Sequence, residues 1–244
     1  MCNISVACRI EEHPATRQDV QMIDTETLDT RGFAVIPGLL GPAACRDLAA
    51  LWPDEGVFRK KIVMQRHGYG RGEYQYFAYA LPEPVERLRQ TLYPPLAAIA
   101  NRWNEQLGSE RRFPPTLTAW LRECHAGGQK RPTPLLLRYG PGDYNCLHRD
   151  LYGDLVFPLQ VAILLSEPAR DFTGGEFLLV EQRPRQQSRG EVVALKQGDA
   201  VVFAVNERPV AGARGFHRTA MRHGVSSLRE GERFTLGIIF HDAA

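Results

Sequence analysis

The sequence predicts an α+β protein, with helices in its first half and an antiparallel β-core in its second half. From residue 135 onward, short runs rich in Val, Ile, Leu and Phe alternate with turns that contain Gly, Pro and Asp. Such a series of short strands is typical of a sandwich or a small barrel. The chain has 244 residues, of which 43% are hydrophobic and 24% are charged. This composition predicts a sizeable buried core and excludes a disordered chain, a collagen-like chain and a coiled coil.

Local signals define each expected element. Proline is tolerated in the first turn of a helix, where its missing N–H needs no partner, so Gly41-Pro42 and Pro82 are expected to open helices. In order, the expected elements of the first half are a strand and turn over 32–40, a helix from 41 to about 52, two strands with a Gly-rich turn over 58–79, a helix from 82 to about 107 that is interrupted or kinked at Pro94-Pro95, and a helix from 116 to about 124. The expected strands of the second half are 135–139, 147–152, 159–165, 175–180, 191–195, 200–205, 223–227 and 234–241.

Charge is distributed unevenly along the chain. There are 30 Lys and Arg against 28 Asp and Glu, a formal net charge of +2. Residues 1–30 hold two positive and six negative residues, a net of −4, which leaves 28 positive and 22 negative residues, a net of +6, for residues 31–244. We interpret residues 1–30 as an acidic leader or arm and residues 31–244 as one domain. A basic body suits an anionic ligand or a polyanion such as nucleic acid.

Compartment and membrane association follow from what the sequence lacks. No apolar run approaches the roughly 20 residues that a membrane helix needs, and the N-terminal residues do not have the pattern of a secretory signal. The five cysteines are scattered, odd in number and without CxxC spacing, which favours free thiols in a reducing compartment. We therefore expect a cytoplasmic protein with no membrane partner.

The most informative motif is His148-Arg149-Asp150. Residues two apart on a strand point to the same face, so the imidazole and the carboxylate are expected to bind one ion together. A third ligand must come from another strand, and His223 is the best placed, with His217 and His241 as alternatives. Two histidines and one carboxylate form the facial triad of non-haem Fe(II) oxygenases, which leaves three positions open. A 2-oxo acid takes two of these positions and dioxygen takes the third.

An oxo-acid cosubstrate with a second, distal carboxylate needs a cationic residue in the pocket, so we expect one near this metal site. Arg233 lies ten residues after His223, at the head of a predicted strand. Its planar guanidinium can hold a carboxylate through two hydrogen bonds, which a lysine cannot do. Arg229 is the alternative, but it lies in the preceding turn, where we expect it to be solvated.

Several motifs together resemble those of the Fe(II)/2-oxoglutarate dioxygenases, over residues 135–242. These motifs are Tyr139-Gly-Pro-Gly, His148-Arg-Asp150, Gly174-Gly-Glu-Phe, Gly198-Asp-Ala-Val-Val-Phe and His223-Gly-Val with Arg233-Phe-Thr-Leu. The resemblance implies a double-stranded β-helix (jelly-roll) core with supporting helices on its N-terminal side and the metal at its open mouth. The cofactors that it implies are Fe(II), 2-oxoglutarate and dioxygen, with ascorbate in a supporting role.

The resemblance also implies roles for five residues. His148, Asp150 and His223 correspond to the iron ligands, which are also the catalytic residues. Arg233 corresponds to the arginine that binds the C5 carboxylate of 2-oxoglutarate. Tyr139, nine residues before the first ligand, matches a tyrosine that contacts the cosubstrate in several members of the superfamily.

Two branches of the superfamily remain open as models for the substrate. Residues 138–150 and 223–229 resemble AlkB-type enzymes, which demethylate alkylated bases, and residues 147–242 resemble a bacterial family described as oxygenases acting on damaged DNA. AlkB-type enzymes have a second arginine six residues after the first, where this chain has Ile239. Residues 33–40 and the following helix match the prolyl-hydroxylase-like branch. Hydroxylation of an amino acid, peptide or small natural product is therefore the alternative, and a non-catalytic jelly-roll binding protein is a further one.

We assign residues 31–134 to helical support and a substrate lid, and residues 135–242 to the jelly-roll core. Within the first region, the segment 58–79 has a basic and aromatic pattern. Enzymes that act on a flipped or single-stranded base use aromatic stacking and a basic groove. A hairpin with a solvated basic face explains the same pattern. The residues concerned are Arg59, Lys60, Lys61, Arg66 and Arg71, interleaved with Phe58, Tyr69, Tyr74 and Tyr76.

Overall fold

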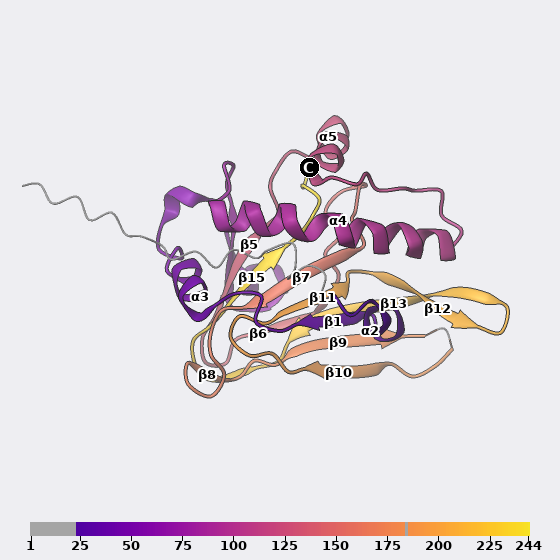
Figure 1. Ribbon diagram of the computed structural model, residues 1–244. Helices are drawn as coiled ribbons and strands as arrows, with labels where there is room; N and C mark the ends of the chain where they lie inside the picture. Colours follow the sequence, from indigo (N-terminus) through magenta and orange to yellow (C-terminus); the bar gives the residue numbers. More distant parts are fainter. Residues whose placement is uncertain (1–22, 184) are drawn as a thin grey trace, which may run out of the picture.

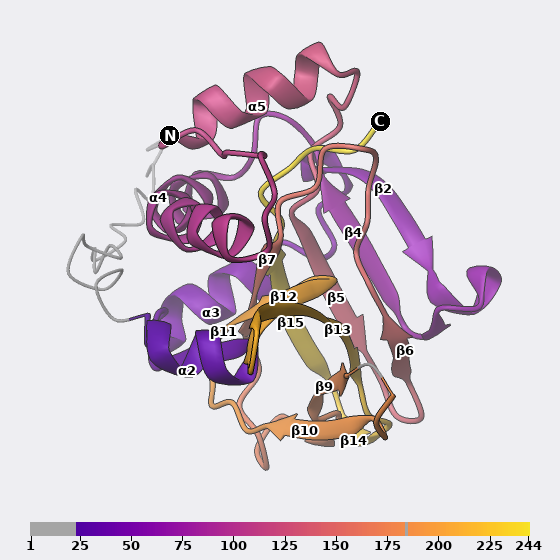
Figure 2. The same cartoon turned by 90° about the vertical axis from the view of Figure 1, so that its right-hand side faces the viewer.

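Two antiparallel sheets face each other in the computed structural model, which describes residues 23–183 and 185–244 (Figures 1 and 2). The larger sheet has the order β1 (Phe33–Ile36), β11 (Ala200–Ala204), β7 (Leu159–Leu164), β15 (Arg233–Ile238), β5 (Leu135–Tyr139), β4 (Glu73–Phe77) and β2 (Phe58–Val63). The smaller sheet has the order β10 (Arg189–Val193), β9 (Phe177–Gln182), β13 (Gly215–Val225), β6 (Tyr144–His148) and β3 (Gly70–Arg71), with β12 (Glu207–Gly212) paired to β13. A separate pair joins β14 (Leu228–Gly231) to β8 (Phe172–Gly174).

Among the residues that the structure describes, four α-helices lie outside the sheets (Figure 2). They are α2 (Thr25–Arg31), α3 (Pro42–Ala49), α4 (Glu83–Gln106) and α5 (Leu117–Ala126), and two short 3-10 turns occupy Glu55–Val57 and Met64–His67. The α+β class is therefore confirmed. None of the helices described is long and apolar enough to cross a membrane.

Aromatic side chains join the layers. Phe177 of β9 and Phe203 of β11 meet between the two sheets, with ring centroids 5.2 Å apart. On the helical side, Tyr93 of α4 packs against Phe157 and Phe240 at 5.1 and 6.0 Å. Strands β7 and β15 are buried along almost their whole length because one face meets α4 and the other faces the smaller sheet.

The structure corrects three expectations about the elements. Helix α4 continues through Pro94 and Pro95 as one element, so the predicted interruption is wrong; the flanking Leu92, Tyr93 and Leu96 are fully buried, and their packing offsets the cost of proline in the helix. The hairpin β12–β13 was not expected before residue 223, because its sequence is polar and rich in Gly and Arg. Helix α2 takes residues that we assigned to the acidic leader; residues 1–22 of that leader lie outside the described residues.

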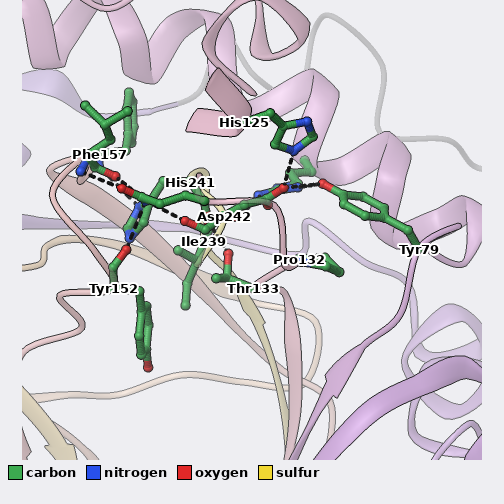
Figure 3. Close-up of polar contacts among 12 residues, drawn as sticks. Tyr79, His125, Pro132, Thr133, Tyr152, Phe157, Ile239, His241 and Asp242 are labelled. Atoms are coloured by element: carbon green, nitrogen blue, oxygen red, sulfur yellow. Dashed lines mark hydrogen bonds and ion pairs between the residues drawn. The ribbon is translucent and has the colours of Figure 1, made fainter. Parts of the chain in front are cut away.

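A buried polar cluster fixes the segment after β15 (Figure 3). Asp242 and Arg89 form an ion pair at 2.8 Å, and the side chains of both are fully buried. The hydroxyl of Tyr79 donates a hydrogen bond of 2.7 Å to Asp242, and His125 Nε2 lies 2.8 Å from the same carboxylate. Asp242 therefore ties this segment to α4 and α5.

His241 lies beside this cluster and is also buried (Figure 3). Its Nδ1 accepts the backbone N–H of Phe157 at 3.2 Å, while its Nε2 has no partner among the described residues. Burial, followed by the charge of Arg89, lowers the pKa of His241 to about 4. The imidazole is therefore neutral in the folded protein at neutral pH.

We expect His241 to make stability depend on pH. An unfolded histidine titrates at about 6.5, so the unfolded chain binds more protons than the folded protein below that pH. The stabilisation is present above pH 6.5 and is lost as the pH falls towards 4, by up to about 3 kcal/mol. Urea denaturation across this pH range measures the loss, and His241→Gln is expected to flatten the slope. Parallel profiles for the two proteins would contradict the assignment.

Candidate metal centre and cosubstrate cavity

Three of the residues predicted from the sequence meet at one point between the sheets. His148, Asp150 and His223 each offer one ligand atom, and these atoms all lie within 4.8 Å of one another. Asp150 Oδ1 is 3.4 Å from His148 Nε2, and Asp150 Oδ2 is 3.3 Å from His223 Nε2. Two imidazoles and one carboxylate form the donor set of a non-haem Fe(II) site with open positions, so these side chains could hold that ion.

The pairing of β6 with β13 places the two histidines. His148 and His223 are direct partners across these strands, and their ring centroids are 4.2 Å apart. Gly224 makes this pairing possible: a Cβ at residue 224 would lie 2.7 Å from the carbonyl oxygen of Asn145 on β6. Only glycine lets the backbones approach so closely next to His223.

Asp150 reaches the site in a different way from the one predicted. We expected His148 and Asp150 to share one face of a strand over 147–152, but β6 ends at His148. Residues 149–158 form no helix or strand, and Asp150 is buried within this loop. A loop has no alternation of faces, so the strand rule did not apply, although the two side chains still converge.

Hydrogen bonds and charge prepare the three side chains for a cation. His148 Nδ1 donates a hydrogen bond of 2.8 Å to the carbonyl oxygen of Cys146, which directs Nε2 of the same ring towards Asp150. Burial raises the pKa of Asp150, but hydrogen bonds from His148 and His223 outweigh it and hold that pKa well below its usual range. Burial and the charge of His148 lower the pKa of His223. The centre thus combines a carboxylate with a histidine held neutral.

A cavity of about 490 Å³ opens onto these residues. Both sheets line it, and so does the segment 58–79. From that segment the lining residues are Lys60, Ile62, His67, Tyr69, Tyr74 and Tyr76. Two neighbouring cations are engaged elsewhere: Arg59 donates to the carbonyl oxygen of Pro132 at 2.8 Å, and Lys61 pairs with Glu73 at 2.9 Å. Part of the basic aromatic segment therefore faces the cavity, and part does not.

Arg233, the predicted carboxylate-binding residue, lies in the wall of the same cavity. It is 2% exposed, and its Nη1 donates to Thr235 Oγ1 at 2.7 Å, while its Nε has no partner among the described residues. Burial lowers the pKa of Arg233 to about 10. The guanidinium therefore remains a cation at neutral pH.

A comparison with two other buried arginines shows what Arg233 lacks. Arg89 pairs with Asp242, and Arg208 pairs with Glu181. Within residues 23–183 and 185–244, no carboxylate lies at ion-pair distance from Arg233. A buried charge without a counter-ion is costly, so an anion bound at this wall of the cavity would offset that cost.

Tyr139 lies beside this arginine. It is the partner of Arg233 across β5 and β15, it is fully buried, and the guanidinium carbon is 5.6 Å from the centre of its ring. Its hydroxyl accepts a hydrogen bond of 3.4 Å from Asn145. Burial raises the pKa of Tyr139 to about 12, so the hydroxyl keeps its proton.

The three alternative residues lie away from this centre. His217 is exposed near the tip of the β12–β13 hairpin, opposite Val210. His241 is buried beside the Asp242 cluster (Figure 3) and is not one of the three side chains that converge. The side chain of Arg229 is 71% exposed and contacts Glu176 at 3.3 Å.

Sequence reasoning missed several residues that line the cavity. They include Asn145, Leu151, Tyr152 and Gln160. Asn145 and Tyr152 flank the His148–Asp150 motif within three residues, so proximity to the motif was the one signal that could have found them. Gln160 lies in an apolar run of β7. As the one polar residue of that run, it marks the face of the strand that lines the cavity.

Comparison with known proteins identifies relatives of this chain. The model of the Oxygenase-NA family, described as "Oxygenase, catalysing oxidative methylation of damaged DNA", matches residues 72–243. Two Mycobacterium tuberculosis proteins, "Uncharacterized protein MT2286" and "Uncharacterized protein Rv2227", are each 51% identical over 195 residues, which is 78% of this chain and 84% of theirs.

Solved structures with the same fold include two prolyl hydroxylases. The Trichoplax adhaerens enzyme, in complex with a hypoxia inducible factor peptide fragment, has a TM-score of 0.56 at 15% identity, over 93% of this chain and 90% of that one. The Pseudomonas putida prolyl-4-hydroxylase has a TM-score of 0.53 at 16% identity, over 90% and 97%. At this identity the likeness establishes a shared fold. The family match over residues 72–243 shows that the chain belongs to the Oxygenase-NA family of oxygenases, and its histidine–aspartate–histidine centre could hold the metal ion of such an enzyme.

Proposed function

We propose that this oxygenase removes methyl groups from alkylated bases of nucleic acid by oxidising them. We further propose that the two facing sheets form a double-stranded β-helix with the metal at its mouth. One observation carries the enzymatic part: a histidine–aspartate–histidine centre shares one cavity with a buried arginine that has no counter-ion among the described residues. The first suits a metal with open positions, and the second suits the far carboxylate of an oxo acid.

His148 Nε2, one oxygen of Asp150 and His223 Nε2 would hold Fe(II), which supplies the activation of dioxygen when it is bound. Arg233 would bind the C5 carboxylate of 2-oxoglutarate, with Tyr139 alongside it. In the overall reaction, 2-oxoglutarate loses CO₂ and gains one oxygen atom to become succinate. The other oxygen atom is inserted into a substrate C–H bond. A hydroxylated N-methyl group then leaves as formaldehyde.

The residues at the rim of the cavity favour a planar, anionic substrate. Tyr69 is 50% exposed and stacks on His67, with ring centroids 5.3 Å apart and an angle of 22° between the planes. Lys60 and Arg149 also line the cavity. Exposed aromatic rings beside cations are the means by which proteins bind an extruded or single-stranded base. The description of the family supports the same substrate class.

One observation favours a second candidate, hydroxylation of an amino acid, peptide or small natural product. Residue 239, where AlkB-type enzymes have a second arginine, is a buried isoleucine that packs with Ile62, Tyr76 and Leu135. This chain therefore offers a cosubstrate one cation fewer than those enzymes do.

We expect His148→Ala to reduce turnover by at least about 100-fold, because it removes a ligand of the metal. The assay measures succinate formed from 2-oxoglutarate with Fe(II) and a methylated oligonucleotide. His217→Ala removes an exposed histidine and serves as the control with wild-type turnover. Equal rates for wild type and His148→Ala would sink the proposal.

Replacing Arg233 by lysine is expected to raise KM for 2-oxoglutarate about 10- to 100-fold, because a point charge replaces a two-pronged donor. Steady-state kinetics with varied 2-oxoglutarate measure the change, and Arg229→Lys is the matched control for an exposed arginine. An unchanged KM would show that the cosubstrate is held elsewhere.

Salt dependence separates the two substrate classes. If nucleic acid is the substrate, affinity for a methylated oligonucleotide should fall steeply as salt rises, because phosphate contacts release counter-ions. Fluorescence anisotropy at several salt concentrations measures the slope. An absence of binding even at low salt would favour the second candidate.

A further inference from the structure

The loop over 149–158, which contains the proposed metal ligand Asp150, also contains a tyrosine whose hydroxyl contacts that ligand. Tyr152 donates a hydrogen bond of 2.8 Å to Asp150 Oδ1. Among the described residues, this is the one hydrogen bond that Asp150 receives from outside the histidine–aspartate–histidine set. We propose that Tyr152 is a positioning residue, which orients Asp150 so that it binds the metal through its other oxygen. This inference rests on the proposed ligand role of Asp150.

The two oxygens of Asp150 have different surroundings. Each oxygen lies near one histidine nitrogen, Oδ1 at 3.4 Å from His148 Nε2 and Oδ2 at 3.3 Å from His223 Nε2, but of the two only Oδ1 accepts the hydrogen bond from Tyr152. An oxygen that already accepts a strong hydrogen bond is a poorer donor to a cation, so Asp150 is biased to coordinate through Oδ2 alone. Coordination through both oxygens would occupy a position that the cosubstrate or dioxygen needs. Tyr152 therefore protects an open position.

Packing holds the ring of Tyr152 in place. It meets Tyr76 of β4 edge to face, with centroids 6.2 Å apart and planes at 90°. On the other side its centroid is 6.2 Å from that of the buried His241 (Figure 3). Aromatic contacts of this kind restrict the ring, so the direction of the hydroxyl is set by the core.

Gln129 holds the backbone of the same loop. Its side chain is buried, and Nε2 donates to the carbonyl oxygens of Tyr152 and Leu155, each at 3.0 Å, and of Asp242 at 2.6 Å. Its Oε1 accepts the N–H of Leu155 at 2.8 Å. Gly153 has a φ of +91°, and a Cβ there would lie 2.6 Å from Gln129 Cδ. The loop is therefore fastened immediately after the ligand, and Tyr152 transmits that position to Asp150.

The test is a metal titration of Tyr152→Phe, which keeps the ring and removes only the hydroxyl. Metal-free protein is titrated with Co(II) without oxygen, and the visible absorption of the bound ion reports both affinity and coordination. Loss of a partner of this kind weakens metal binding about 10- to 100-fold, and we expect that weakening together with a changed Co(II) spectrum. Tyr144→Phe, which removes an exposed hydroxyl from β6, should bind Co(II) as wild type does.

Two further variants make each outcome decisive. Gln129→Met retains volume but loses the bonds to the loop, so it should weaken Co(II) binding in the same direction. Asp150→Ala should abolish the wild-type spectrum. If it does so while Tyr152→Phe and Gln129→Met bind Co(II) like wild type, the inference is overturned and the proposed metal site stands. If wild type and Asp150→Ala behave alike, the metal site and the inference both fail.

Discussion

The pairing of His148 with His223 across β6 and β13 is the constraint on which the site depends. It brings together two residues 75 positions apart in the chain, and it requires a glycine at position 224 because the backbones pass so closely there. Main-chain hydrogen bonds of the sheet hold both strands, so the histidines inherit the rigidity of the sheet. The rest of the centre is arranged around this pair: the loop brings Asp150, and the opposite sheet brings Arg233.

The sheet stabilises the positions of the two histidines, whereas the burial of Arg233 costs folding free energy. The other two buried arginines in the described part of the chain, Arg89 and Arg208, each pair with a carboxylate, whereas Arg233 donates a hydrogen bond to a neutral threonine. The cavity is thus electrostatically incomplete in the free protein, and an anionic ligand completes it. A ligand that binds only the folded state also stabilises it, so binding of the anion and the stability of the fold would be linked at this residue.

Much of this arrangement could be predicted from the sequence. The runs at 135–139 and 200–205 gave strands almost to the residue, because both are apolar and bounded by Gly and Pro turns. The hairpin β12–β13 escaped prediction before residue 223 because its tip, residues 211–218, is exposed and has no apolar alternation. The three proposed metal ligands and Arg233 were predicted from their spacing, and all four line one cavity in the structure. The contact of Gln129 with Tyr152 was out of reach, because a hydrogen bond between residues 23 positions apart leaves no trace in local periodicity.

The location of Asp150 on a loop, while the histidines lie on paired strands, has a kinetic meaning. In the proposed centre, the histidine pair is held by paired strands and lines the cavity, so capture of an ion would begin there. The loop over 149–158 brings the carboxylate, so release of the ion would require Asp150 to separate from the pair. Uptake and retention would then depend on different parts of the chain. A mutation in the loop can shorten the residence time of the ion without slowing its entry.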